Sequence, residues 1–123
     1  MAGSATVITE TRIGPVKRVK IAWTSDDTTG EVTGTTTYGY SGKLELVTTV
    51  PSGGGTAPTA LYDVTVTDAD SVDVLAGAGA NRSATVTEQV LGTSLGAVAM
   101  SKLTLNVTNA GNSKQGTIYL DIR

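Results

Sequence analysis

The chain contains no histidine, no cysteine and no phenylalanine among its 123 residues. Histidine is the commonest general base, cysteine is a strong nucleophile, and both are favoured ligands of transition metals. Without cysteine no disulfide can form, so the fold depends on packing, on sheet hydrogen bonds or on a partner subunit. We therefore predict no enzymatic activity, no metal site and no bound cofactor.

Long apolar runs are also missing. No stretch of about 18 apolar residues occurs, so the sequence predicts no transmembrane helix and no membrane partner. The first ten residues lack the basic and apolar regions of a secretory signal peptide. The net charge of −2 is too small to favour nucleic acid as a partner.

Threonine is abundant, at 22 residues, and 15 glycines accompany it. β-branched residues favour strands, and glycine favours the tight turns between them. Apolar and polar residues alternate, as in half-buried strands, over Val16–Trp23, Glu31–Tyr40, Lys43–Val50, Leu61–Asp68, Lys102–Thr108 and Thr117–Arg123. Further short strands are expected at Val7–Thr11 and Val72–Leu75, and Thr85–Leu91 fits either a strand or one helical turn.

From these segments we expect seven or eight short strands at spacings near ten residues. The pattern predicts an all-β fold, an antiparallel β-sandwich that is jelly-roll-like or a small barrel. We expect one domain over residues 7–123, preceded by a flexible N-terminal arm at residues 1–6. Ser41-Gly42 is a two-residue hairpin signal, which would pair the strand before it with Lys43–Val50.

Three aspartates lie within six residues at a predicted turn, Asp68, Asp70 and Asp73. Calcium binds several converging oxygen ligands, but this segment lacks the glycine and the distal glutamate of a calcium loop. Aspartate is also common in turns because its side chain accepts nearby backbone N–H groups. We favour this structural role over a calcium site.

Candidate binding residues are four cations and two tyrosines. Arg12, Lys17, Arg18 and Lys20 give the first 25 residues a local charge of +3, whereas residues 26–80 carry −7. The cations could face solvent, contact an acidic protein partner or contact nucleic acid, which we do not favour because no aromatic residues are interleaved for base stacking. Tyr38 and Tyr40 are expected on one strand face, in the core or at a subunit interface.

Three stretches resemble small proteins encoded by tailed bacteriophages and prophages. They are Val7–Trp23 (VITETRIGPVKRVKIAW), Tyr62–Val90 (YDVTVTDADSVDVLAGAGANRSATVTEQV) and Leu103–Arg123 (LTLNVTNAGNSKQGTIYLDIR). The resemblance implies a virion structural protein, most simply a capsid decoration or cement protein. It carries no catalytic signature, so no functional residues follow from it.

The implied partner is the major capsid protein, with the chain on the outer surface of the head and in the host cytoplasm during assembly. A homo-oligomer is expected, with a trimer favoured, and the oppositely charged segments would suit contacts between like subunits. The alternatives are a tail component, a head–tail adaptor or a receptor-binding β-domain. A free-standing carbohydrate-binding module is a further alternative, which would need Trp23, Tyr38 or Tyr40 to be exposed.

Overall fold

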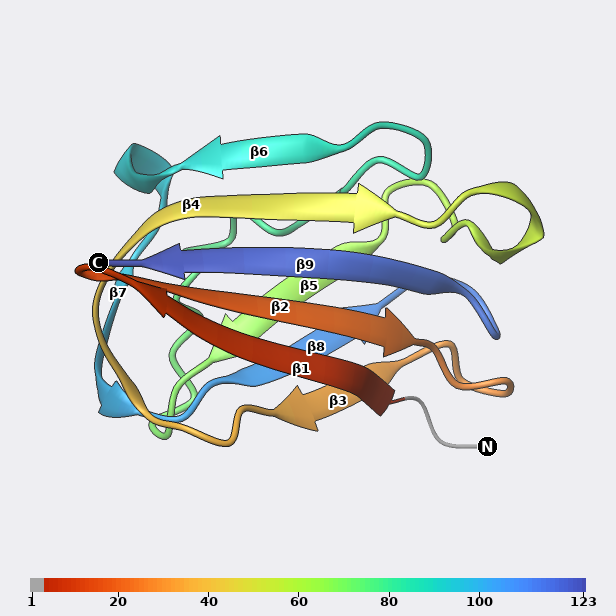
Figure 1. The fold of residues 1–123 in the computed structure, drawn as a ribbon. Coiled ribbons are helices and arrows are strands. Elements are labelled where there is room, and N and C mark those ends of the chain that lie inside the picture. Colours follow the sequence, from red (N-terminus) through yellow and green to blue (C-terminus); the bar gives the residue numbers. More distant parts are fainter. Residues whose placement is uncertain (1–3) are drawn as a thin grey trace.

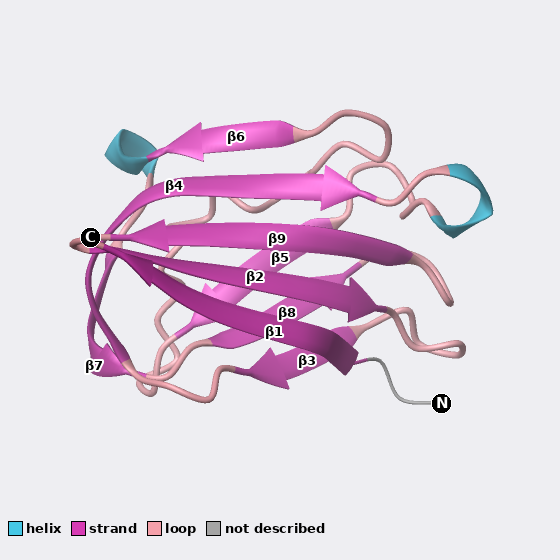
Figure 2. Ribbon diagram, viewed as in Figure 1, coloured by secondary structure: helices cyan, strands magenta, loops and turns pink. Residues whose placement is uncertain are grey.

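The structure is a computed structural model that describes the backbone of residues 4–123 and the side chains of residues 9–12 and 14–123. Strands and loops make up almost all of this part of the chain, with two single turns of 3-10 helix, η1 (Gly54–Thr56) and η2 (Gly92–Ser94) (Figure 2). The strands are β1 (Ser4–Ile13), β2 (Val16–Thr24), β3 (Val32–Thr35), β4 (Tyr40–Pro51), β5 (Asp63–Thr67), β6 (Glu88–Leu91), β7 (Ala97–Ser101), β8 (Thr104–Thr108) and β9 (Gln115–Ile122). The predicted all-β sandwich is confirmed, with nine described strands where seven or eight were expected.

The strands follow one hydrogen-bonded order, β5-β8-β3-β1-β2-β9-β4-β6, and β7 pairs with β4. In Figure 1 the strands β6, β4, β9, β2 and β1 form a front layer, and β5, β8 and β3 cross behind it. The layers are joined where β1 meets β3, at a parallel contact between Ser4 and Thr33. The other pairs of described strands are antiparallel.

The core lies between the two layers and follows the predicted alternation. Tyr62, Val64 and Val66 are each at most 2% exposed. The inward residues of β8 and β9, together with Leu103 just before β8, are fully buried, namely Leu103, Leu105, Val107, Ile118, Leu120 and Ile122. Fully burying one such aliphatic side chain contributes about 1.5–3 kcal/mol, so these three faces carry much of the stability.

β4 departs from simple alternation. The alternation over Lys43–Val50 places Leu44, Leu46 and Val50 on one face, but in the structure Leu44 and Val47 are buried and Leu46 is only half-buried. The register of β4 against β9 shifts between Leu44 and Leu46. A β-bulge at this point adds one residue to β4, so the side chains that follow it move to the opposite face.

The hairpin expected at Ser41-Gly42 is wrong, because both residues lie inside β4. β3 pairs with β8 and β1, and does not pair with β4. The strand expected at Val72–Leu75 is also wrong, since this segment forms turns next to a single bridge between Thr67 and Asp73.

The arm expected at residues 1–6 falls partly outside the described residues, which begin at Ser4. β1 starts at this residue, and Ser4 and Ala5 lie opposite Thr24 and Trp23 of β2. Residues 4–6 therefore belong to the sheet, because the edge of β2 offers hydrogen-bond partners to this end of β1.

Candidate protein interface

The segment between β3 and β4 crosses from the rear layer to the front layer at the end of the sandwich where the C-terminus lies (Figure 1). Gly42 makes this crossing possible. Its φ is +137°, and a Cβ atom there would lie 2.1 Å from the carbonyl oxygen of Arg123. Lys43 and Arg123 then exchange backbone hydrogen bonds of 3.1 and 2.9 Å.

Two side chains attach this crossing segment to the β1–β2 hairpin. Oε1 of Glu10 accepts hydrogen bonds from the Tyr40 hydroxyl and from the Tyr38 N–H, the latter at 3.3 Å. Lys17 Nζ donates to the carbonyl oxygen of Ser41 at 2.8 Å. Burial and the nearby Glu10 carboxylate raise the pKa of Tyr40, so its hydroxyl stays protonated and remains a donor.

A shallow hollow of about 320 Å³ lies where these segments meet. It adjoins a second hollow of about 370 Å³, which includes Ser41 and Met100. Tyr38 is 64% exposed and Met100 is 90% exposed at this place. The first hollow is lined by Glu10, Thr11, Arg12, Lys17, Tyr38, Gly39 and Tyr40.

The hollow brings together Arg12, Lys17, Tyr38 and Tyr40 from the predicted set. The two tyrosines differ in environment, although the sequence placed them on one face. Tyr40 is 7% exposed and its ring belongs to the core, whereas Tyr38 projects from the surface. The chain leaves β3 at Thr35, so Tyr38 and Tyr40 do not share a regular strand.

The other two predicted residues, Arg18 and Lys20, lie away from the hollow on the outer face of the front layer. The Arg18 guanidinium carbon is 4.3 Å from the centre of the Tyr119 ring, and Lys20 Nζ is 5.8 Å from it. Arg18 Nε also lies 3.4 Å from a carboxylate oxygen of Asp121, its cross-strand neighbour. These two cations therefore interact with their own sheet.

Sequence reasoning missed Glu10 and Met100. Glu10 could have been found, because residues two apart on a strand share a face and Arg12 was already a candidate. Met100 gave no such signal, since it lies in a small apolar segment without a clear period. Its φ of +47° is rare for a residue other than glycine and turns the chain at the end of β7.

The aspartates of the predicted turn point at backbone N–H groups. Asp68 Oδ1 accepts from Asp70 and Val72 at 2.9 and 3.0 Å. Asp73 accepts from Val66, Leu75 and Gly77 at 3.0–3.2 Å. These bonds support the turn role over calcium, and the part of the chain that the structure describes holds no cluster of three or more acidic residues suited to a metal ion.

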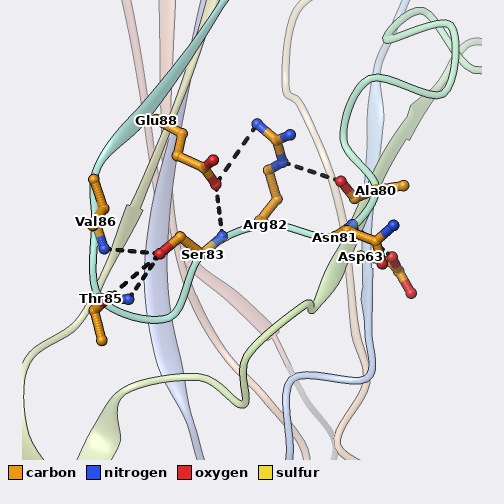
Figure 3. Close-up of polar contacts among 8 residues, drawn as sticks. All are labelled: Asp63, Ala80, Asn81, Arg82, Ser83, Thr85, Val86 and Glu88. Atoms are coloured by element: carbon orange, nitrogen blue, oxygen red, sulfur yellow. Dashed lines mark hydrogen bonds and ion pairs between the residues drawn. The ribbon is translucent and has the colours of Figure 1, made fainter.

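A second polar cluster precedes β6, where Arg82 and Glu88 point toward each other (Figure 3). Arg82 Nη1 and Glu88 Oε1 are 3.9 Å apart, and the same oxygen accepts the Ser83 N–H at 2.6 Å. The Ser83 hydroxyl in turn accepts the N–H groups of Thr85 and Val86 at 3.2 and 3.0 Å. These contacts order the loop that leads into β6.

Over residues 4–123, no helix is long and apolar enough to cross a bilayer. Comparison of the chain with protein-family models, with curated proteins and with solved structures found no match.

Proposed function

We propose that the chain is a non-catalytic structural protein of a phage virion, a capsid decoration or cement protein. It binds the outer surface of the head and stabilises contacts between subunits of the major capsid protein. The phage context comes from the resemblance of the three sequence stretches. The binding role is supported by one observation in the fold, the convergence of Arg12, Lys17, Tyr38 and Met100 around two adjoining hollows that share Arg12 and Lys17.

Tyrosine, arginine and methionine are enriched at protein interfaces, and tyrosine and arginine often carry much of the binding energy. The segment that presents Tyr38 is held in place by the bonds from Glu10 and Lys17. A surface that is ordered before binding loses less conformational entropy when its partner arrives. This end of the sandwich is therefore suited to docking on a rigid protein lattice.

A non-catalytic role agrees with the state of the acid in the hollow. The Glu10 oxygen that faces the tyrosines already accepts two hydrogen bonds. A general base must be free to take a proton from a substrate. Glu10 instead serves to fix the crossing segment.

The proposal is tested by co-sedimentation of the purified chain with heads of the phage whose genome encodes it, prepared without this chain. We expect saturable binding of the wild type and about thirtyfold weaker binding of Tyr38→Ala, the loss of a typical hot-spot side chain. Thr93→Ala, on an exposed turn, is the matched control and should bind like the wild type. Absence of the wild type from sedimented heads would contradict the cement role.

Cryo-electron microscopy of the complete particle separates the alternatives. Density on the outer head surface at three-fold or quasi-three-fold positions would support the cement role and the expected homotrimer. Density restricted to the tail or portal would favour the adaptor or receptor-binding role. A sugar-binding version has little support, because Trp23 is 2% exposed and Tyr40 7% exposed, which leaves Tyr38 as the accessible ring of the three.

A further inference from the structure

The hollow carries two cations that have no carboxylate of the described residues within ion-pair distance. Arg12 has no ion-pair partner among the residues that the structure describes, and Lys17 donates to the uncharged carbonyl of Ser41. Glu10, the acid in the lining, is engaged by Tyr38 and Tyr40. By contrast, Arg18 and Arg82 have carboxylates at 3.4 and 3.9 Å.

Apolar surface lies beside these cations. Met100 and Tyr38 are among the most exposed large apolar side chains of the described residues. The Tyr38 hydroxyl has no hydrogen-bond partner among those residues, so it remains available as a donor. A guanidinium, an ammonium and a phenol around one hollow are three groups that donate hydrogen bonds to a carboxylate.

We propose that the hollow is a carboxylate-binding site, which receives an aspartate or glutamate side chain from the protein surface on which the chain docks. This inference rests on the proposed function and specifies the chemistry of its partner. Arg12 and Lys17 bind the carboxylate, and Met100 and Tyr38 contact the apolar residues beside it. The partner surface is therefore acidic and partly apolar at this point.

A second copy of the chain fits the hollow less well than a different protein. Its acidic segment, residues 26–80, uses several of its carboxylates internally, since Asp63, Asp68 and Asp73 accept backbone N–H groups of their own chain. A nucleic-acid backbone is also a poorer fit. It requires many cations along a track, whereas this hollow contains two cations and one acid.

The first test compares charge reversals in the head-binding assay. Arg12→Glu places a negative charge in the hollow and should weaken binding about a hundredfold or more, because like charges would then face each other. Lys20→Glu changes the net charge equally on the outer sheet face, and should weaken binding less than about threefold. Equal losses in the two variants would overturn the proposal, since only the overall charge would then matter.

Arg12 is exposed, so Arg12→Glu should fold, and its circular dichroism melt should match that of the wild type. Rising salt should weaken wild-type binding and should have less effect on Arg12→Gln. Analytical ultracentrifugation of the chain alone tests the remaining alternative, that a second copy of the chain occupies the hollow. A wild-type oligomer that Arg12→Glu dissociates would assign the hollow to a second copy and overturn the proposal.

The second test needs no heads and therefore separates this inference from the proposed function. A capped Leu-Glu-Leu tripeptide is titrated into the labelled chain to millimolar concentration, and amide NMR shifts are followed. We expect saturable shifts at Glu10–Arg12, Lys17 and Tyr38–Ser41, and none with capped Leu-Gln-Leu. Identical shifts with both peptides would overturn the carboxylate site even if the chain binds heads. Peptide binding without head binding would leave the site standing and contradict the cement role.

Discussion

The Tyr40 hydroxyl donates to the carboxylate of Glu10, a residue 30 positions earlier in the chain. This bond attaches the start of β4 to β1 and closes one end of the sandwich beneath the exposed Tyr38. The buried ring of Tyr40 thus supports the surface that we assign to docking.

Tyr40→Phe keeps the ring and removes this hydrogen bond. We expect a loss of about 1.5–3 kcal/mol in the free energy of unfolding, as for other hydrogen bonds to charged groups. Urea denaturation followed by circular dichroism measures it. Tyr38→Phe removes a hydroxyl that has no partner among the described residues, and should leave stability unchanged. Equal effects of the two variants would show that the Glu10 bond adds no stability.

Alkaline pH should destabilise the protein. Burial raises the pKa of Tyr62 and of Tyr40 above the ordinary value of 10.0. Above that value the unfolded chain loses tyrosine protons that the folded chain keeps, so stability falls as pH rises. The drop in unfolding free energy between about pH 8 and about pH 11 should be smaller in Tyr40→Phe than in the wild type. An equal drop in both proteins would mean that Tyr40 titrates normally.

Acid should remove a different contribution to the stability of the fold, that of the Asp63 carboxylate. The N–H of Asn81 and the side-chain amide of Asn109 bond to Asp63 and lower the pKa of its carboxyl below 3.8. The charged form therefore stabilises the fold above this value, and that stability is lost as pH falls through the lower folded-state pKa. Asp63→Asn should cost about 1 kcal/mol near pH 7, and this cost should shrink as the pH falls through the lowered folded-state pKa. A cost that does not depend on pH would show that the charge is irrelevant.

Gly116 allows β9 to lie against the indole of Trp23. A Cβ atom at this position would approach Cζ2 of Trp23 to 2.5 Å. Gly116→Ala should therefore cost about 1–3 kcal/mol through overpacking and shift the fluorescence of the single tryptophan. Gly53→Ala is the control, because its Cβ would meet nothing within 4 Å. If Gly116→Ala and Gly53→Ala have the same melting temperature, the packing of Trp23 is looser than the structure indicates.

The faces of β5 can be tested by two aspartate substitutions at neighbouring positions. Val64 is 2% exposed, so Val64→Asp should bury an unpaired charge and unfold the protein. Thr65 is exposed and lies opposite Asn106, so Thr65→Asp should remain folded. Far-ultraviolet circular dichroism at room temperature distinguishes the two outcomes, and two folded variants would contradict the assigned faces.

The sequence predicted the fold class because alternation survives in the strands that form the core. Tyr62, Val64 and Val66 show the period without interruption, and the inward residues of β8 and β9 do so as well. Alternation failed in β4, where one extra residue at the bulge reverses the faces that follow it. The pattern of apolar residues alone does not reveal such an extra residue.

Two other errors have tertiary causes. Gly42 resembles a turn residue, but its positive φ serves the approach of β4 to the backbone of Arg123. Val74 and Leu75 are buried without forming a strand, since the backbone of Val74 bonds to Val66 and to Gly96 and that of Leu75 to Ala78, so no single strand pairs with both. A short apolar run cannot distinguish this arrangement from a strand.

The candidate site was predicted in part. Arg12 and Lys17 are neighbours across the β1–β2 hairpin, which strand pairing alone suggests. Their meeting with Tyr38 and Met100 depends on a chain crossing between layers and on the end of β7. No local pattern encodes that meeting, because the segments are separated by more than 20 residues in sequence.

The position of β9 has a consequence for how the chain is made. β9 lies between β2 and β4, although it follows both in the chain and leaves the ribosome after them. Until it emerges, β2 and β4 each expose an unpaired edge. The front layer therefore closes only after synthesis of Gln115–Ile122, and a nascent chain stalled before this segment would be prone to aggregation.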